Sequence, residues 1–264
     1  MNPLTDARIA FSALAVLLLS LLAGCSTTPE TIDGRPPETP RFTDHTLQKK
    51  ISSGEVVTLQ EEAPDPWGGF NRGMYTFNAR LDRYVLLPVV RGYEAVTPKI
   101  ARTGVSNFFS NLDEIRNFIN ALLQLKGEKA VHTAARFTWN STLGMLGVID
   151  VATPMELPKR KEDFGQTLGF YGVGTGPYLV LPVLGPSNLR DTGGLLVDTL
   201  LGMRTNPVNR VLDGHPRRQA AYYTMKVIDG RYVNKFRYYD MGTPFEYNWV
   251  KYLYTKMRQL EIAD

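Results

Sequence analysis

The residue types that most often carry catalysis or bind metals are sparse in this sequence and are not arranged for either role. The three histidines, His45, His132 and His215, lie far apart, and none belongs to a His-Glu-x-x-His zinc-binding pattern. A Gly-x-Ser-x-Gly nucleophile elbow, typical of α/β-hydrolase lipases, is absent, as is a Walker-type phosphate loop. The sequence therefore predicts no catalytic site, no metal site and no bound cofactor.

Two segments have patterns that superficially suggest ligand binding. Gly172–Gly176 alternates glycine as a nucleotide loop does, but it lacks the Gly-x-Gly-x-x-Gly spacing, and Pro177 follows where a helix should begin. Tight turns are the better interpretation of this segment. The charged run Lys159–Asp163 is most simply a solvated loop, with contact to lipid headgroups as the alternative.

Cys25 has a chemical role that its surroundings specify. It is the only cysteine, so it forms no disulfide within the chain. The apolar run Phe11–Leu22 before it is too short to span a membrane but suits a signal peptide. The tetrapeptide Leu-Ala-Gly-Cys that ends at this residue resembles the bacterial lipobox, whose cysteine is acylated and becomes the new N-terminus. An incidental cysteine behind a cleaved secretory signal is the alternative. Ser26, where Asp often retains a lipoprotein at the inner membrane, is compatible with export to the outer one.

Three parts of the chain are predicted. Residues 1–24 are a lipoprotein signal peptide, residues 25–63 hold the lipidated cysteine and a flexible tether, and residues 64–264 form a helical domain. The tether prediction rests on prolines such as Pro36 and Pro37 among polar residues with little apolar periodicity. A small folded module is the alternative for that stretch.

The helical domain is expected to open with an amphipathic helix. Asp65 suits its N-cap, Pro66 suits its first position, and Pro88 is expected to end it. Apolar residues recur at steps of three and four: Trp67, Phe70, Met74, Phe77, Leu81 and Val85. Polar residues fall mostly on the other side: Asn71, Arg72, Asn78, Asp82 and Arg83. This spacing is typical of a helix with two distinct faces.

Other helices are expected over residues 97–127, 128–143 and 217–239. Thr97 is predicted to cap the first of these. Residues Thr243 to Glu246 form a capping-box pattern that begins a last helix. One face of this helix is apolar: Phe245, Trp249, Leu253, Met257 and Leu260.

Between these helices, Gly144–Gly194 is crowded with glycine and proline, which break regular helix. We expect a compact, irregular segment there, buried or facing a membrane, with a short helical turn over Asp163–Leu168. Its longest apolar run, Tyr178–Leu184, is far shorter than the roughly 20 residues that a membrane span needs. No strand pattern of any length is convincing, so the predicted fold class is mainly α.

The apolar faces allow two interpretations. Periodicity alone favours packing into an ordinary soluble core. The alternative is that the helices lie flat at membrane depth, since a helix satisfies its own backbone hydrogen bonds. The formal net charge of +4 is too small and too scattered to indicate a nucleic-acid partner, although it suits a surface near anionic lipid.

The motifs of the domain, taken together, resemble the MlaA (VacJ) family of outer-membrane lipoproteins. They are Asp65–Arg72, Met74–Asn78, Asn140–Gly144, Asp150–Ala152, Phe164–Gly169, Gly172–Tyr178 and Leu189–Asp191. The resemblance covers about half of the chain and is weak in the C-terminal helices, so their role is left open.

The resemblance implies a ring-like arrangement of amphipathic helices lying in the membrane plane, anchored by lipid on the periplasmic side of the outer membrane. Such a protein removes mislocalised phospholipid from the outer leaflet through a central channel. It passes the lipid to a periplasmic carrier protein, maintains lipid asymmetry, and associates with a trimeric porin. Phe70 and Asn71 are the candidate gating residues. The alternatives are a phospholipase-like enzyme that faces the periplasm and a scaffolding lipoprotein.

Overall fold

The computed structural model describes residues 64–263, and the predicted signal peptide, Cys25 and tether lie outside this range. The described part is mainly α-helical, as the sequence predicts. Its elements are α2 (Gly68–Leu81), the π-helical turn η2 (Asp82–Leu86), α3 (Leu87–Val96), α4 (Lys99–Leu123), α5 (Gly127–Thr142), the 3₁₀ turn η3 (Thr153–Met155), α6 (Phe164–Phe170), β1 (Tyr178–Leu181), β2 (Gly185–Asn188), α7 (Leu189–Thr205), α8 (Pro207–Val211), α9 (Pro216–Val233) and α10 (Glu246–Ala263).

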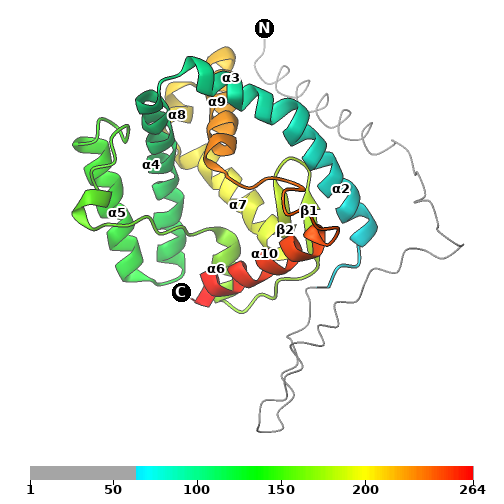
Figure 1. The fold of residues 1–264 in the computed structure, drawn as a ribbon. Coiled ribbons are helices and arrows are strands. Elements are labelled where there is room, and N and C mark those ends of the chain that lie inside the picture. The colour runs from blue at the N-terminus through cyan, green and yellow to red at the C-terminus, as the bar shows by residue number, and fades with distance from the viewer. Residues whose placement is uncertain (1–63, 264) are drawn as a thin grey trace, which may run out of the picture. The chain divides into compact units, whose positions relative to one another are not determined.

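Elements far apart in the sequence lie side by side in this part of the chain (Figure 1). α2 continues through η2 into α3, α3 packs on α9, and α9 packs on α4. α4 in turn contacts α6, α6 contacts α10, and α10 contacts β2. Because β2 pairs with β1 and β1 packs on α2, these contacts form a closed circuit. α5 packs along α4, and α7 contacts α4, α6 and β2.

The start of the first helix differs from the prediction. α2 begins at Gly68, and Asp65 does not cap it. The Asp65 carboxylate instead accepts hydrogen bonds from the Asn71 amide (2.7 Å) and from the Tyr247 hydroxyl (2.6 Å). A residue that the sequence assigns to local helix capping therefore links the first helix of the domain to the last.

The predicted end of that helix at Pro88 is also wrong. In η2 the Leu87 N–H bonds to the carbonyl of Asp82, five residues earlier, and the chain then continues as α3. This wider turn resets the hydrogen-bond pattern, so that Pro88 lies in the first turn of α3, where its missing N–H costs little. One bent rod thus extends from Gly68 to Val96.

The next two predicted helices are confirmed as α4 and α5, with boundaries shifted by a few residues. Thr97 is extended and its side chain does not cap α4, which starts after Pro98. The helix predicted over residues 217–239 is α9, which ends at Val233. The residues after it, up to α10, are not helical.

The glycine- and proline-rich segment contains more regular structure than predicted. Its short helical turn is confirmed as α6, where the Asp163 carboxylate caps the helix by accepting from the Gln166 N–H. Strands β1 and β2 form an antiparallel hairpin with Tyr178 opposite Asn188, and this hairpin corrects the prediction of no strands. Four residues per strand give too little alternation to detect, and α2 supplies part of their hydrogen bonding. α7, which follows the hairpin directly, was also not predicted.

The last helix has the predicted position but a different start and a different buried face. Glu246 does not complete a capping box with Thr243, because its carboxylate accepts from the Met241 N–H (3.0 Å) and the Tyr75 hydroxyl (2.5 Å). The residues that α10 buries are Glu246, Tyr247, Val250, Lys251 and Arg258. Most of its predicted apolar face is exposed instead: Trp249, Leu253, Met257 and Leu260.

Apolar packing is concentrated where α2, the hairpin and α10 meet. We call this cluster the aromatic corner; it comprises Tyr75, Tyr178, Val180, Tyr247 and Val250. Elsewhere in the described residues, most of the buried side chains are polar or charged, and many large apolar side chains are exposed. This distribution is the reverse of an ordinary soluble core.

Candidate functional site

The polar side of α2 holds the hairpin in place. Asn71 is fully buried; its amide nitrogen donates to the Tyr178 carbonyl (3.0 Å), and its amide oxygen accepts from the Val180 N–H (2.9 Å). Seven residues further along, on the same helix face, the Asn78 amide nitrogen donates to the Leu181 carbonyl (2.9 Å). Two asparagine amides thus replace the neighbouring strand that β1 lacks on this side, and we call these contacts of Asn71 and Asn78 the α2 clamp.

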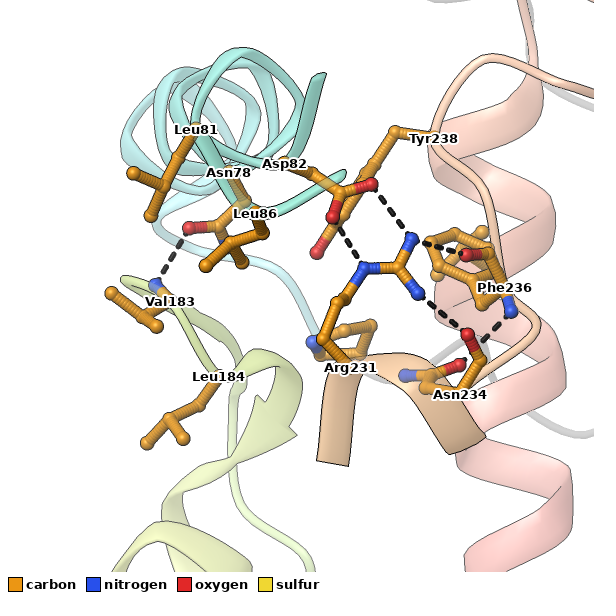
Figure 2. A pocket seen from close by; sticks show the side chains of 12 residues that line it. Asn78, Leu81, Asp82, Leu86, Val183, Leu184, Arg231, Asn234, Phe236 and Tyr238 are labelled. Atoms are coloured by element: carbon orange, nitrogen blue, oxygen red, sulfur yellow. Dashed lines mark hydrogen bonds and ion pairs between the residues drawn. The ribbon is translucent and has the colours of Figure 1, made fainter. Parts of the chain in front are cut away.

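A cavity of about 190 Å³ lies beside this contact and is lined by residues of α2, the hairpin, the end of α9 and the segment after it (Figure 2). Asn78 also accepts from the Val183 N–H (2.7 Å) at its edge. Figure 2 shows Arg231 forked against Asp82; its Nη2 donates to Asp82 Oδ2 (2.8 Å) and to the Phe236 carbonyl (3.0 Å). The wall of the cavity therefore combines apolar side chains with one buried ion pair.

The interface of α4 and α5 is built on a buried charge network, which we call the Arg136 cluster: Glu114, Arg136, Asn140 and Asp150. Arg136 is 1% exposed, and its Nε donates to the Glu114 carboxylate at 2.8 Å. Its Nη2 reaches both Asp150 oxygens at 3.3 Å. Asn140 donates to Asp150 (3.2 Å) and accepts from two backbone N–H groups after it. Every charge in the cluster has a partner, as burial requires.

A second network joins α6, α7 and α10 through Arg258. This guanidinium donates to both oxygens of Asp163 (2.8 Å each) and to Asp191 (2.8 Å). Burial opposes ionisation of the two carboxyls, but the hydrogen bonds from Arg258 outweigh it and hold the pKa of both Asp163 and Asp191 below the ordinary value of 3.8. Three helices from distant parts of the sequence are thereby joined.

The predicted solvated loop Lys159–Asp163 is only partly correct. Lys159 is exposed, but the Glu162 side chain is buried and accepts from Lys129 (3.0 Å) and from Gln124 (2.8 Å). Glu162, near the acidic end of the run, is therefore part of the buried hydrogen-bond network and not of a solvated loop. Of the tight turns predicted over residues 172–176, one is present at Tyr171–Gly172, and residues 173–176 then run to β1 without regular structure.

Apolar side chains cover much of the outside of the same helices. Val131 on α5 and Leu146 in the turn after it are both 71% exposed. The others on α4, α5, α7 and the turns after α5 include Ile100, Leu122, Leu123, Trp139, Met145, Ile149, Leu196, Leu200 and Met203. None of the helices in residues 64–263 combines the length and the apolar character needed to cross a bilayer. Exposed apolar surface of this extent is typical of faces that contact other proteins or membranes.

The two predicted gating residues point to different environments. Phe70 is 44% exposed on the apolar side of α2, whereas Asn71 is fully buried against β1. Cys25 and His45 fall outside the described residues. His132 and His215 are not part of any group of three or more metal-ligating side chains among the residues described.

Sequence reasoning missed Asn78, Asp82 and Arg231 as members of this region. The signal for two of them was present, because Asn71, Asn78 and Asp82 share one helix face, at spacings of seven and four. Arg231 is 149 residues from its partner Asp82, and no local pattern predicts that pairing.

Comparisons with known proteins agree with the family resemblance of the sequence motifs. A family model described as MlaA lipoprotein matches residues 63–261. The chain is 45% identical over 148 residues to the intermembrane phospholipid transport system lipoprotein MlaA of Shigella flexneri, a match that covers 54% of this chain and 59% of that protein. The protein of the same description from Escherichia coli K12 is 44% identical over 146 residues, covering 53% and 58%. The chain thus spans just over half the length of these curated relatives.

A solved structure described as the structural basis for maintenance of bacterial outer membrane lipid asymmetry is similar in fold. Its TM-score is 0.62 at 35% sequence identity, and the alignment covers 75% of this chain and 98% of that chain. The family model and this structure both extend well beyond the half of the chain that carries the sequence motifs. The chain belongs to the MlaA lipoprotein family.

Proposed function

We propose that this protein removes mislocalised phospholipid from the outer leaflet of the outer membrane and so maintains lipid asymmetry. Acylated Cys25 anchors the chain on the periplasmic side. The helical domain lies in the inner leaflet as a ring-like arrangement of helices around a path for lipid. A periplasmic carrier protein receives the phospholipid, and a trimeric porin associates with the domain. The lipid is moved without chemical change.

The observation that carries this proposal is the inverted distribution of polarity: apolar side chains cover the outside of helices whose buried residues are largely polar. A phospholipid that changes leaflets must bring its headgroup past hydrocarbon, where an unpaired polar group costs several kcal/mol, on the order of 2–7. A path with polar groups along it lowers that cost. The closed circuit of contacts between elements further supports a ring.

The proposed gating role of Phe70 and Asn71 fits a path bordered by α2 and the hairpin. Asn71 holds the backbone of β1, so its substitution releases the hairpin from the helix. Phe70 lies on the exposed side, where it contacts membrane lipid or the associated porin in this proposal. Changes at the two positions should therefore alter permeability by different routes.

A deletion strain tests the proposal directly. We expect phospholipid to accumulate in its outer leaflet and detergent sensitivity to rise, with both restored by the wild-type chain and not by Cys25→Ala. Normal outer-leaflet composition in the deletion strain would contradict the proposal.

Purified protein incubated with labelled phospholipid separates transport from the enzymatic alternative, since the transporter leaves the lipid intact. Release of fatty acid or lysolipid would favour the enzyme. Photo-crosslinking of phospholipid to the buried side of α2 would argue against a role that is only scaffolding.

A further inference from the structure

A second cavity, of about 500 Å³, lies along the α2–η2–α3 rod, against residues 237–240. Four arginines line it, Arg80, Arg83, Arg91 and Arg237. We call it the arginine pocket. Its volume lies within the roughly 300–1,000 Å³ that is common for small-molecule sites.

Three of these arginines, Arg80, Arg83 and Arg91, lie in one stripe along the rod, and Arg237 faces them from the segment after α9. Positions 76, 80, 83, 87 and 91 are separated by steps of three and four, and all five line the pocket. The stripe passes through η2, and π-helical turns within α-helices are frequent at functional sites. The rod thus presents a row of guanidiniums to one cavity.

The charge of the arginine pocket is not neutralised from within. Asp82, one of its two acidic residues, is already paired with Arg231 outside the pocket, which leaves Asp240 against four arginines. Among residues 64–263, the guanidinium groups of Arg80, Arg83 and Arg91 form no side-chain hydrogen bond or ion pair. Uncompensated guanidiniums in one concavity are arranged to bind an anion.

The surroundings indicate which anion. Tyr84 and Tyr239 line the pocket and are 71% and 51% exposed, and Val85 and Val89 are exposed on the same rod. A guanidinium fork matches the geometry of phosphate oxygens, and aromatic residues with one wet end suit the membrane interface. We propose that the arginine pocket binds the phosphate group of an anionic ligand, a phospholipid headgroup or free phosphate.

This inference rests on the proposed function for its lipid source but is tested separately. Full-length, acylated protein in neutral detergent is titrated with soluble dihexanoyl phosphatidylglycerol and with inorganic phosphate, and binding is followed by calorimetry. The variant carries Arg83→Gln and Arg91→Gln; the matched control carries Arg217→Gln and Arg218→Gln, exposed residues of α9 outside the pocket. Thermal melts verify that both variants fold.

We expect the pocket variant to bind about tenfold more weakly or worse, because two charge-assisted hydrogen bonds are lost, while the control binds as the wild type does. Arg83→Lys with Arg91→Lys keeps the charge without the fork and should fall between them. Binding of phosphatidylglycerol alone identifies a headgroup site, and equal binding of inorganic phosphate identifies free phosphate. Equal binding by the pocket and control variants, or no binding by the wild type, overturns the proposal.

The two proposals fail separately. If the wild-type chain restores the outer leaflet of the deletion strain but binds neither probe, the arginine pocket is not a phosphate site and the transport function stands. If it binds phosphatidylglycerol through this pocket but the deletion strain has a normal outer leaflet, the site stands and the transport function does not.

Discussion

At the aromatic corner, tyrosine rings pack edge to face; Tyr75 and Tyr178 each lie against Tyr247, at centroid distances of 5.8 and 6.1 Å. At the Arg136 cluster, by contrast, the interior between α4 and α5 is a guanidinium with two carboxylates, and Val131 and Leu146 face outward. The corner buries its apolar area as a soluble protein does. At the cluster, the apolar side chains are exposed instead, and hydrogen bonds among charged groups fill the interior.

The two regions are expected to differ in how well they tolerate substitution. A buried charge network is stable only while every member has a partner, so removing one member costs more than trimming an apolar side chain. In the proposed function, the exposed apolar side chains around the cluster contribute to membrane contact rather than to folding. Four changes to the protein or its pH test that division, in decreasing order of the stability that each should remove.

Arg136→Met should have the largest effect. It leaves Glu114 and Asp150 without their shared cation in a buried site, at a cost of about 3–5 kcal/mol in unfolding free energy. Urea unfolding in mild detergent, followed by circular dichroism, measures this. The control is Arg160→Met, whose ion pair with Glu128 is exposed and should contribute only about 0–1 kcal/mol. Similar losses for both variants would mean that burial of the cluster is unimportant.

Asn71→Leu should come next. It keeps a similar volume but leaves the Tyr178 carbonyl and the Val180 N–H unpaired, and since each buried unpaired group costs roughly 1–3 kcal/mol, we expect a loss of about 2–4 kcal/mol. The neighbouring Phe70→Leu, on an exposed position, should change unfolding free energy by less than about 0.5 kcal/mol. A hairpin that stays protected from hydrogen exchange in Asn71→Leu would contradict the clamp.

Acidification should have a smaller effect, specific to the ion pairs of Arg258. The pKa values of Asp163 and Asp191 are lower in the folded chain than the ordinary 3.8, so their stabilisation is complete above that pH and is lost as pH falls through the folded values. In Arg258→Met the fall in unfolding free energy between neutral pH and pH 3 should be shallower. Val250→Ala, at the aromatic corner, should lower stability without changing its pH profile.

Val131→Ser with Leu146→Ser should affect folding least. Both side chains are 71% exposed, so stability in detergent should change by less than about 0.5 kcal/mol. Flotation with phospholipid vesicles, in a Cys25→Ser background that lacks the anchor, should show weaker membrane association. Glu128→Gln, a polar change on the same helix, is the control. Loss of folding without loss of flotation would reverse the assignment of inner and outer faces.

Most helical segments, although not α7, could be predicted from local pattern, whereas two other features could not. The aromatic corner includes strands too short to show alternation, and the α2 clamp joins residues more than 100 positions apart, Asn71 to Tyr178 and Asn78 to Leu181. The predicted helix end at Pro88 was wrong because that prediction assumes an uninterrupted α-helical hydrogen-bond pattern, and the π-turn changes that pattern. The capping roles predicted for Asp65 and Glu246 were wrong because their carboxylates accept hydrogen bonds from side chains outside the predicted caps.

Local patterns were enough to predict the family resemblance, the mainly α fold class and the positions of most helices, because periodicity and motifs are local properties. Periodicity also divided α2 and α10 into polar and apolar sides. Which of these sides faces inward could not be predicted locally, since that depends on whether distant partners pair with the buried polar groups. Arg231 pairs with Asp82, Arg258 pairs with Asp163 and Asp191, and many apolar side chains of these helices face outward.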